Sequence, residues 1–465
     1  GAAVPSAAIT VTNEATGARR ASSTDVEGRY EVLALPIGTY SVTAEAQGFR
    51  TTTNTGIKLE TGRVAVLNIQ VEVGAIAEKV TVEAAPPMLE ASHAAIGQVV
   101  QNKAVLELPL NGRSFASLAL ITPQVSPGRS QAAWYPTMPG SALDVTISGS
   151  RAENNQVTLD GTTVTNDYTG GTIIYPSVDA LQEFQIVQGS YSADLGARLG
   201  QVLLATKSGT NEFHGSAFEF LRNDALNARN FFSARKSSLR QNQFGASFGG
   251  PVKLPGIYDG KNKTHFFLSY EGTRIHLGLT GIYSVSTARM RTGDLSEAGR
   301  TIIDPSTKQP FPNNAIPANR LDPIAVGLFA KLSYPLPNYP GVSQNYRISP
   351  VNTRALNQGS ARLDHSFSAR DKISGTFQIS RYDTYTPRTT TVAPSANNMP
   401  SLVVSTNYVH VFSPRMLNIV KVGYSDFRPL QPNLNPPNLT IRELGFPNDP
   451  YQALAHGRSA GPGFL

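Results

Sequence analysis

Alternation of apolar and polar residues, repeated along the second half of the chain, is the feature that most limits what this chain can fold into. Phe244, Ala246 and Phe248 alternate with polar or small residues, and the same pattern recurs at Phe266–Tyr270 and Ile373–Ile379. Successive side chains of a β-strand point to opposite faces of its sheet. Each run therefore predicts a strand with one apolar face and one polar face.

A membrane-spanning helix is not an alternative for these segments. The best apolar run, Ile324–Ala330, is far shorter than the about 18 residues that such a helix needs. If the alternating runs cross a bilayer, they must do so as a β-barrel, because only a closed sheet satisfies the backbone there. Further runs near Leu363, Val403–Val411 and Leu417–Tyr424 bring the expected total to about eight strands.

The connections between the expected strands are of two kinds. Ala369–Asp371 is a short turn, whereas a proline-rich segment from about Met290 to Thr353 is a long loop. Membrane barrels have short turns on the periplasmic side and longer loops outside the cell. We therefore expect the long loop to be extracellular.

Short alternating runs of a different texture occupy the N-terminal part, between Ala8 and Val73. Gly, Asn and Asp turns separate them at close intervals, which predicts a β-sandwich. Gly28 and Gly38 stand at turns, and Tyr40 is among the residues expected to point inward. The expected strands are Ile9–Val11, Tyr30–Val32, Tyr40–Ala44, Val64–Val66 and Leu67–Val73.

Composition and charge narrow the function. Only 16% of residues are charged, while 40 Gly and 32 Pro favour turn-rich β structure. The absence of cysteine excludes disulfides, thiolate metal sites and cysteine nucleophiles. The net charge of +7 comes from Lys and Arg that are spread along the chain rather than clustered. This distribution argues against nucleic-acid binding.

No catalytic constellation is visible, so we expect neither an enzyme nor a cofactor. The string Gly245–Gly249 matches a nucleophile elbow, but an elbow needs a strand followed by a helix, and here Gly250–Pro251 ends an alternating run. Asp160 is explained by a turn and Glu183 by the start of a helix. The histidines show no metal-ligand spacing. They are His93, His214, His265, His276, His365, His410 and His456.

The N-terminal region resembles the carboxypeptidase regulatory-like family. The likeness rests on Thr24–Tyr30, Leu35–Val42 and Gly48–Phe49, and covers about residues 1–76, with the first strand of the family missing. No peptidase chemistry follows from this resemblance. Such modules are also similar to starch-binding sandwiches, so carbohydrate binding is an open alternative to a purely structural module.

A second resemblance is to the plug domain of TonB-dependent receptors, over about residues 92–209. Asn102–Leu110 predicts a short helix, and Val145–Arg151 and Asn155–Gly161 predict two strands, the second ending in an Asp-Gly turn. Val178–Val187 predicts a helix start and then a strand. The family's likeness is strongest in this last segment and in Tyr191–Val202.

The most specific signal lies where the plug would pass into the barrel. Thr206–Gly215 and Leu221–Phe232 closely resemble Oar-like receptors, and Asn242–Gly245, Gly249–Pro251 and Phe266–Arg274 continue the likeness. The resemblance implies an architectural role for the junction. Its residues are Lys207, Ser208, Gly209, Thr210, Asn211, Phe213, His214 and Gly215.

The linker of residues 77–91 looks like the family's TonB box. The proposed contact residues are Glu78, Lys79, Val80, Thr81 and Val82, followed by Pro86–Pro87. An exposed segment of this kind can add as a strand to a partner's sheet. The alternative is that Val80 and Val82 only complete the sandwich. The resemblance implies TonB, outer-membrane lipid and an unknown substrate as partners.

Together these observations predict a mainly β protein with an N-terminal β-sandwich, a small α+β plug domain and the N-terminal part of an incomplete antiparallel transmembrane β-barrel from residue 210 to 465. Plugged transporter barrels need about 22 strands of roughly 20 residues each. Residues 213–465 number only 253, which predicts a fragment.

The resulting functional prediction is a TonB-dependent receptor or transporter in the bacterial outer membrane, with plug and sandwich on the periplasmic side. A cell-surface carbohydrate-binding or adhesin-like protein is the alternative. Such a protein would lack membrane-facing aromatic girdles and would fold in water without detergent.

Overall fold

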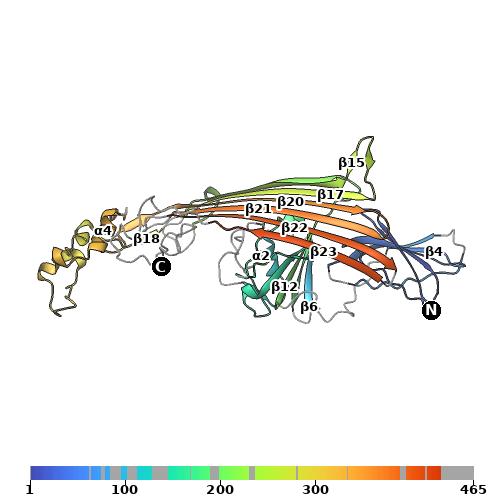
Figure 1. Ribbon diagram of the computed structural model, residues 1–465, viewed down its shortest axis with the longest axis horizontal. Helices are drawn as coiled ribbons and strands as arrows, with labels where there is room; N and C mark the ends of the chain where they lie inside the picture. The colour runs from blue at the N-terminus through green and yellow to red at the C-terminus, as the bar shows by residue number, and fades with distance from the viewer. Residues whose placement is uncertain are drawn as a thin grey trace.

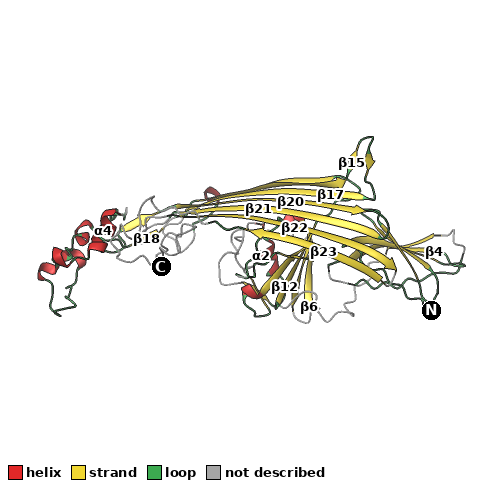
Figure 2. Ribbon diagram, viewed as in Figure 1, coloured by secondary structure: helices red, strands yellow, loops and turns green. Residues whose placement is uncertain are grey.

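A computed structural model of the chain describes residues 2–61, 64–74, 79–83, 96–101, 113–127, 145–167, 169–188, 198–229, 236–278, 281–331, 334–387, 394–413 and 416–430. The fold is mainly β, as predicted, and three large sheets account for most of it (Figure 2). None of the helices in these segments has the length and apolarity needed to cross a bilayer.

The first sheet forms the N-terminal domain. Its strands follow the order β2-β1-β3-β4-β5, and only the β4–β5 pair is parallel. Ile9, Val11, Tyr40 and Val42 are buried together on one face because they alternate with polar neighbours. The strands are β1 (Ala8–Asn13), β2 (Arg19–Ser23), β3 (Gly38–Glu45), β4 (Thr51–Leu59) and β5 (Lys79–Glu83).

The second layer of this domain differs from the prediction. The segments that contain Tyr30–Val32 and Val64–Val71 pack against the core, but within the described residues they belong to no sheet. Tyr30 is held instead by its hydroxyl, which donates to the carbonyl of Leu67 at 3.0 Å. Alternation decides which side chains are buried, whereas a ladder also requires a neighbouring strand in register.

The second sheet forms the plug-like domain, in the order β10-β9-β12-β11-β6. Phe115 of helix α2 (Phe115–Ala119) packs on Phe184 and Ile186 in its core. A 3₁₀ turn, Val178–Ala180, precedes β11, and the short pair β7 (Val125–Pro127) and β8 (Val145–Ile147) lies outside the sheet. The strands are β6 (Ile96–Gln101), β9 (Asn155–Leu159), β10 (Thr162–Thr163), β11 (Leu181–Gln188) and β12 (Gly200–Thr206).

The third sheet is antiparallel throughout and curves over the plug-like domain (Figure 1). Among the described strands β13 and β23 end the sheet, which is curved but not closed. We call it the barrel sheet. Its strands are β13 (His214–Asn223), β14 (Leu239–Pro251), β17 (Thr264–Gly278), β20 (Val351–Ser366), β21 (Asp371–Thr386), β22 (Ser395–Ser413) and β23 (Met416–Phe427).

The two ends of the barrel sheet differ. At one, the turn end, residues 367–370 join β20 to β21, and a hairpin of β15 (Lys253–Leu254) and β16 (Tyr258–Asp259) joins β14 to β17. At the other, the loop end, residues 279–350 join β17 to β20. This long connection contains β18 (Gly281–Tyr283), α3 (Ala288–Arg291), α4 (Pro323–Lys331) and β19 (Tyr346–Ile348). The N-terminal domain lies beside the turn end (Figure 1).

The faces of the barrel sheet have opposite polarity. Polar side chains are buried on the concave face, which meets the plug-like domain, whereas large apolar side chains are exposed on the convex face. A water-soluble sheet has the reverse pattern, with its apolar face buried. Buried polar residues include Gln243, Glu271, Thr273, Gln358, Thr376 and Gln378. Exposed apolar residues include Phe248, Leu268, Tyr270, Leu363, Phe377, Ile379 and Val422.

Candidate functional site: the plug-like domain against the barrel sheet

The carboxylate of Asp160 lies at the centre of the contact between the plug-like domain and the barrel sheet. Asp160 and Gly161 form the predicted turn between β9 and β10, with φ of 48° and 86°. The carboxylate accepts hydrogen bonds from Thr206, whose N–H is 3.0 Å and whose hydroxyl is 2.6 Å away. Thr376 of β21 donates to it at 2.9 Å. The turn thus places a charge against the barrel wall.

Arg362 of β20 supplies the counter-charge. One terminal nitrogen lies 3.4 Å from Asp160 Oδ1 and also donates to the Thr206 carbonyl at 3.1 Å. The rest of the guanidinium forms two 2.9 Å hydrogen bonds with Asp364, which accepts another from Ser208 at 2.7 Å. Removing one partner of a buried charge pair of this kind costs about 3–5 kcal/mol. This network fastens the end of β12 to the barrel.

A second polar contact is centred on Glu271 of β17, whose residue is 3% exposed. Its carboxylate accepts hydrogen bonds from Ser177 of the plug-like domain at 2.6 Å and from Gln243 at 2.7 Å. Gln358 donates to the same carboxylate at 3.2 Å. A buried carboxylate needs such partners, because an unpaired charge is costly away from water.

Arg113 of the plug-like domain makes a third contact, with the first barrel strand. Its guanidinium forms an ion pair with Asp179 and lies 4.1 Å from the ring centroid of Phe218 and 4.9 Å from that of Phe220. Lys207 lies close by, and burial lowers its pKa while the charge of Asp179 opposes that shift. Cation–π and ionic contacts here combine in one partly desolvated cluster.

The junction residues lie where the three sheets meet. The N–H of Asn211 donates to the Ala15 carbonyl of the N-terminal domain at 2.9 Å, and its side chain pairs with Asn262 at 2.6 Å. Phe213 stacks on Phe248 with ring centroids 5.8 Å apart.

At Gly209 of the junction a Cβ atom would lie 2.3 Å from a backbone oxygen, so no larger residue fits. Thr210 donates to the Glu212 carbonyl, and His214 and Gly215 begin β13.

The predicted TonB-box segment is the last strand of the first sheet. Lys79, Val80, Thr81 and Val82 lie in β5, whereas Glu78 is outside the described residues. Val80 pairs with Thr52 of β4. Because β5 ends the strand order, its other side faces no strand in the part of the chain that the structure describes. Among the described strands, the segment therefore pairs on one side only, with β4.

One sequence interpretation of a carboxylate was wrong. Glu183 does not start a helix: the 3₁₀ turn ends at Ala180, and Glu183 lies in β11, where it is 6% exposed. The run from Leu181 to Val187 includes good helix formers, but it pairs with β6 and β12 on both sides. This tertiary pairing overrides the local propensity. The Glu183 carboxylate accepts hydrogen bonds from the backbone and hydroxyl of Thr61 in the N-terminal domain.

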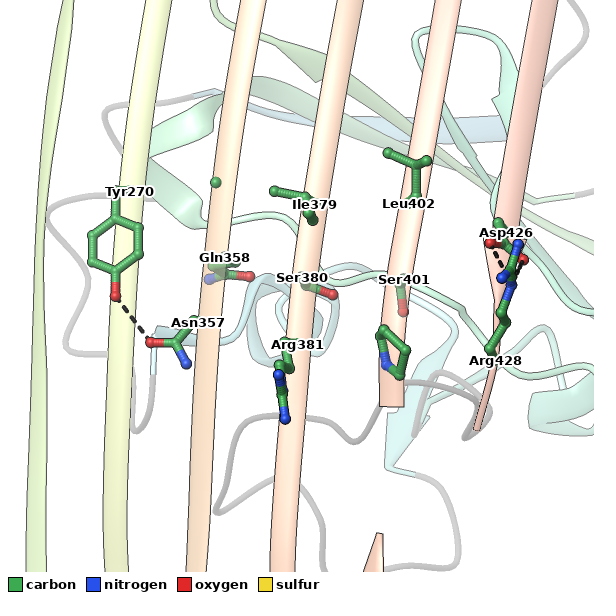
Figure 3. Close-up of a pocket in the computed structure, with 12 residues that line it drawn as sticks. Tyr270, Asn357, Gln358, Ile379, Ser380, Arg381, Ser401, Leu402, Asp426 and Arg428 are labelled. Carbon is green, nitrogen blue, oxygen red and sulfur yellow. Dashed lines mark hydrogen bonds and ion pairs between the residues drawn. The ribbon is translucent and has the colours of Figure 1, made fainter. Parts of the chain in front are cut away.

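A groove of about 460 Å³ lies on the convex face (Figure 3). Tyr270, Ile379 and Leu402 form its apolar part, and Arg381 and Arg428 lie at one end of it. Alternation places these side chains on the face opposite to Glu271 and Gln378. The groove therefore opens away from the plug-like domain and is no part of a path through the barrel.

Asn102–Leu110, the helix predicted within the plug, lies outside the described residues. In the described part, no group of three or more His, Asp or Glu side chains is arranged to hold a metal ion. The contacts between the plug-like domain and the barrel sheet are those of an interface between two domains: hydrogen bonds, ion pairs and packed rings. They are not an arrangement of nucleophile, base and oxyanion donors.

Two protein families match parts of the chain. Residues 205–463 match the family model described as outer membrane beta barrel domain, and residues 1–72 match the carboxypeptidase regulatory-like domain. The TonB-dependent transporter Oar of Myxococcus xanthus is 27% identical over 269 residues, which are 54% of this chain and 24% of that protein.

Two solved structures are similar to the chain at low identity. The outer membrane transporter YddB from Escherichia coli is 12% identical, with a TM-score of 0.43, over 71% of this chain and 38% of that one. The siderophore receptor PiuA from Acinetobacter baumannii is also 12% identical, with a TM-score of 0.39, over 72% of this chain and 46% of that one. The chain thus spans less than half the length of these proteins. Because the barrel-domain model matches more than half of its residues, the chain belongs to the outer membrane β-barrel family and resides in the bacterial outer membrane.

Proposed function

We propose that the chain is part of a TonB-dependent receptor that moves a substrate through its barrel using energy supplied by TonB. The observation that carries this proposal is the seating of a folded domain on the polar concave face of the barrel sheet (Figure 1). A solute that follows this polar face must first displace the domain. The similarity to the TonB-dependent transporter Oar supports the same function.

Displacement needs energy because the seating is held by charge-assisted contacts. Hydrogen bonds to charged groups contribute about 1.5–3 kcal/mol each. Across the interface, Asp160 accepts such bonds from Thr376 and Arg362, and Glu271 accepts one from Ser177. Thermal motion alone would therefore open the path rarely, which favours a mechanical pull from a partner.

The segment Lys79–Val82 is suited to receive that pull. It precedes the plug-like domain in the chain, so tension applied there reaches the plug before the barrel. Short turns of membrane barrels face the periplasm, so we expect the N-terminal domain and β5 to lie on the side of TonB. The side of β5 that faces away from β4 can accept a strand through backbone hydrogen bonds.

Binding of the purified chain in detergent to the periplasmic domain of TonB tests the proposal. Val80→Pro and Val82→Pro together remove two N–H donors and should abolish binding. The matched variant Val80→Thr with Val82→Thr keeps both donors and the β-branched shape, so it should bind as the parent does. Binding by the proline variant, or none by the parent, would contradict the proposal.

A further inference from the structure

The connection between β14 and β17 is longer than the others at the turn end. It comprises residues 252–263, whereas 367–370 join β20 to β21 and 414–415 join β22 to β23. It forms a small hairpin in which Leu254 pairs with Tyr258. Asn262 near its end contacts the junction through Asn211, whereas the β15–β16 hairpin extends beyond that contact.

The tip of the hairpin is apolar and rigid. Leu254, Pro255, Gly256 and Ile257 form a tight turn in which the Ile257 N–H donates to the Leu254 carbonyl at 3.0 Å. Proline presets the second position of such a turn, and Gly256 has the φ of +73° that the third position requires. Leu254 is 51% exposed and Ile257 is 85% exposed. Two apolar side chains are thus held outward at a fixed tip.

The base of the hairpin, which we call its root, contacts the convex face of the barrel sheet where Tyr258 meets Thr264. The Tyr258 hydroxyl shares a hydrogen bond of 2.5 Å with Thr264 Oγ1, which also lies 2.6 Å from His365 Nδ1. By alternation Thr264 is on the same face as Phe266 and Leu268. Figure 1 shows the β15 hairpin standing off this face, away from the plug-like domain and β4.

An aromatic cluster lies next to the hairpin on the same face. The rings of Phe213, Phe248 and Phe266 contact one another with centroids 5.6–6.4 Å apart. Phe266 is two residues from the root at Thr264, a rise of about 7 Å along a strand. Aromatic girdles mark the level at which a barrel leaves the hydrocarbon. The hairpin therefore begins at the headgroup level of the periplasmic leaflet.

The charge of the hairpin fits an anionic lipid surface. Lys253, Lys261 and Lys263 carry three positive charges, and Asp259 carries one negative charge, which leaves a net charge of +2 for residues 252–263. All four residues are exposed. Cationic residues near an anionic membrane surface are attracted to it. Apolar residues at the tip and lysines around them are the composition of an interfacial anchor.

We propose that residues 252–263 are a membrane anchor, with Leu254 and Ile257 inserted into the periplasmic leaflet and the lysines on phospholipid phosphates. The proposal rests on membership of the barrel family and not on TonB-dependent transport. The anchor holds the turn end of β14 and β17, next to the junction, at a fixed depth in the bilayer.

Tryptophan probes test the depth of the tip. The chain has a single tryptophan, Trp134, so Trp134→Phe provides a silent background. In liposomes of phosphatidylethanolamine and phosphatidylglycerol with brominated acyl chains, Ile257→Trp should lose emission nearly as strongly as Leu268→Trp on the convex face. Val66→Trp in the N-terminal domain is the aqueous reference and should keep its emission. An Ile257→Trp probe quenched no more than the Val66→Trp probe overturns the proposal.

A second variant keeps the proposal testable if the probe disturbs the tip. Leu254→Asp with Ile257→Asp should shift unfolding in these liposomes to lower urea concentration, and should leave unfolding in detergent micelles of neutral headgroup nearly unchanged. An equal shift in both media would assign the tip to packing within the protein and would overturn the anchor. Protection of Ile257→Trp from aqueous iodide without quenching by brominated lipid would also overturn it.

Discussion

At the scale of single residues, the polar contacts of the plug-like domain were only partly visible in the sequence. The sequence predicts the turn at Asp160 correctly. Its hydrogen-bond partners across the interface lie more than 200 positions later in the chain, such as Thr376 at a separation of 216. Arg362 and Asp364 could have been recognised as charges two residues apart on the polar face of an alternating strand. Which plug residue they meet depends on tertiary structure.

Asp160→Asn should loosen the plug-like domain. The change keeps the size of the side chain and removes the charge that faces Arg362, so a hydrogen bond to a charged group, about 1.5–3 kcal/mol, is weakened or lost. Hydrogen exchange of the β12 amides should become faster. Thr376→Val removes one donor to the same carboxylate and should have a smaller effect, about 1 kcal/mol. Equal exchange rates in the parent and both variants would contradict this assignment.

Tyr40 predicts a loss of stability at alkaline pH. Burial raises its pKa to about 12, and the hydroxyl donates to the Pro36 carbonyl at 2.5 Å. In the unfolded chain its pKa is about 10. Its contribution is therefore fully present below pH 10 and is lost as the pH rises towards 12, because the unfolded chain gives up the proton first.

The difference in phenolate absorbance between the parent and Tyr40→Phe measures this titration. The titration step that the parent has and Tyr40→Phe lacks should be centred near pH 12. A step centred near the ordinary tyrosine pKa would show that Tyr40 is solvated. At neutral pH the variant should lose about 1 kcal/mol, because only the hydrogen bond is removed and the ring stays packed.

At the scale of elements, alternation predicted the strands of the barrel sheet well and those of the N-terminal domain less well. The barrel strands are long, so the pattern repeats many times: β17 and β20 were each expected from their apolar positions. In the N-terminal domain, residues 64–71 alternate between half-buried and exposed side chains, yet they form no ladder within the described residues. The side chains packed inward are Ala65, Leu67, Ile69 and Val71, whereas Val64 and Val66 are exposed. Burial follows from the local pattern, whereas pairing depends on a neighbour that the pattern does not specify.

Two glycines on the convex face of the barrel sheet predict opposite responses to the same substitution. At Gly250 a Cβ atom would lie 2.3 Å from the Phe213 ring, so Gly250→Ala must displace that ring from the aromatic cluster. Overpacking of this kind costs about 1–3 kcal/mol. At Gly375 nothing lies within 4 Å, so Gly375→Ala should be neutral or stabilise by about 0.4–1 kcal/mol. Urea unfolding of both variants in liposomes would compare them. A larger loss at Gly375 would be inconsistent with the position of Phe213.

At the scale of the whole molecule, the three sheets meet at the turn end of the barrel. Asn211 connects the junction to Ala15 of the N-terminal domain, and Arg20 of that domain donates to the Ala369 carbonyl in a barrel turn. Thr61 and Glu183 connect the N-terminal domain to the plug-like domain. A movement of the N-terminal domain would therefore change contacts with both other sheets, which suits a chain that we propose is pulled from that side.

The polarity of the molecule's surfaces leads to the last prediction. Leu268 on the convex face is 48% exposed and Val66 in the N-terminal domain is 46% exposed, so solvent accessibility alone does not distinguish them. Their surroundings should differ: we expect Leu268 on the convex face to face the hydrocarbon of the bilayer and Val66 to face water. Leu268→Arg should destabilise the protein in liposomes by about 2–4 kcal/mol, because a charge on the lipid face loses its hydration. Val66→Arg should change stability by less than about 0.5 kcal/mol, as surface substitutions usually do. Urea unfolding of both variants in liposomes measures the difference. Equal effects would mean that the convex face is not in contact with lipid, whereas a large effect at Leu268 alone would identify that face as the membrane surface and make its exposed apolar residues a requirement of the bilayer.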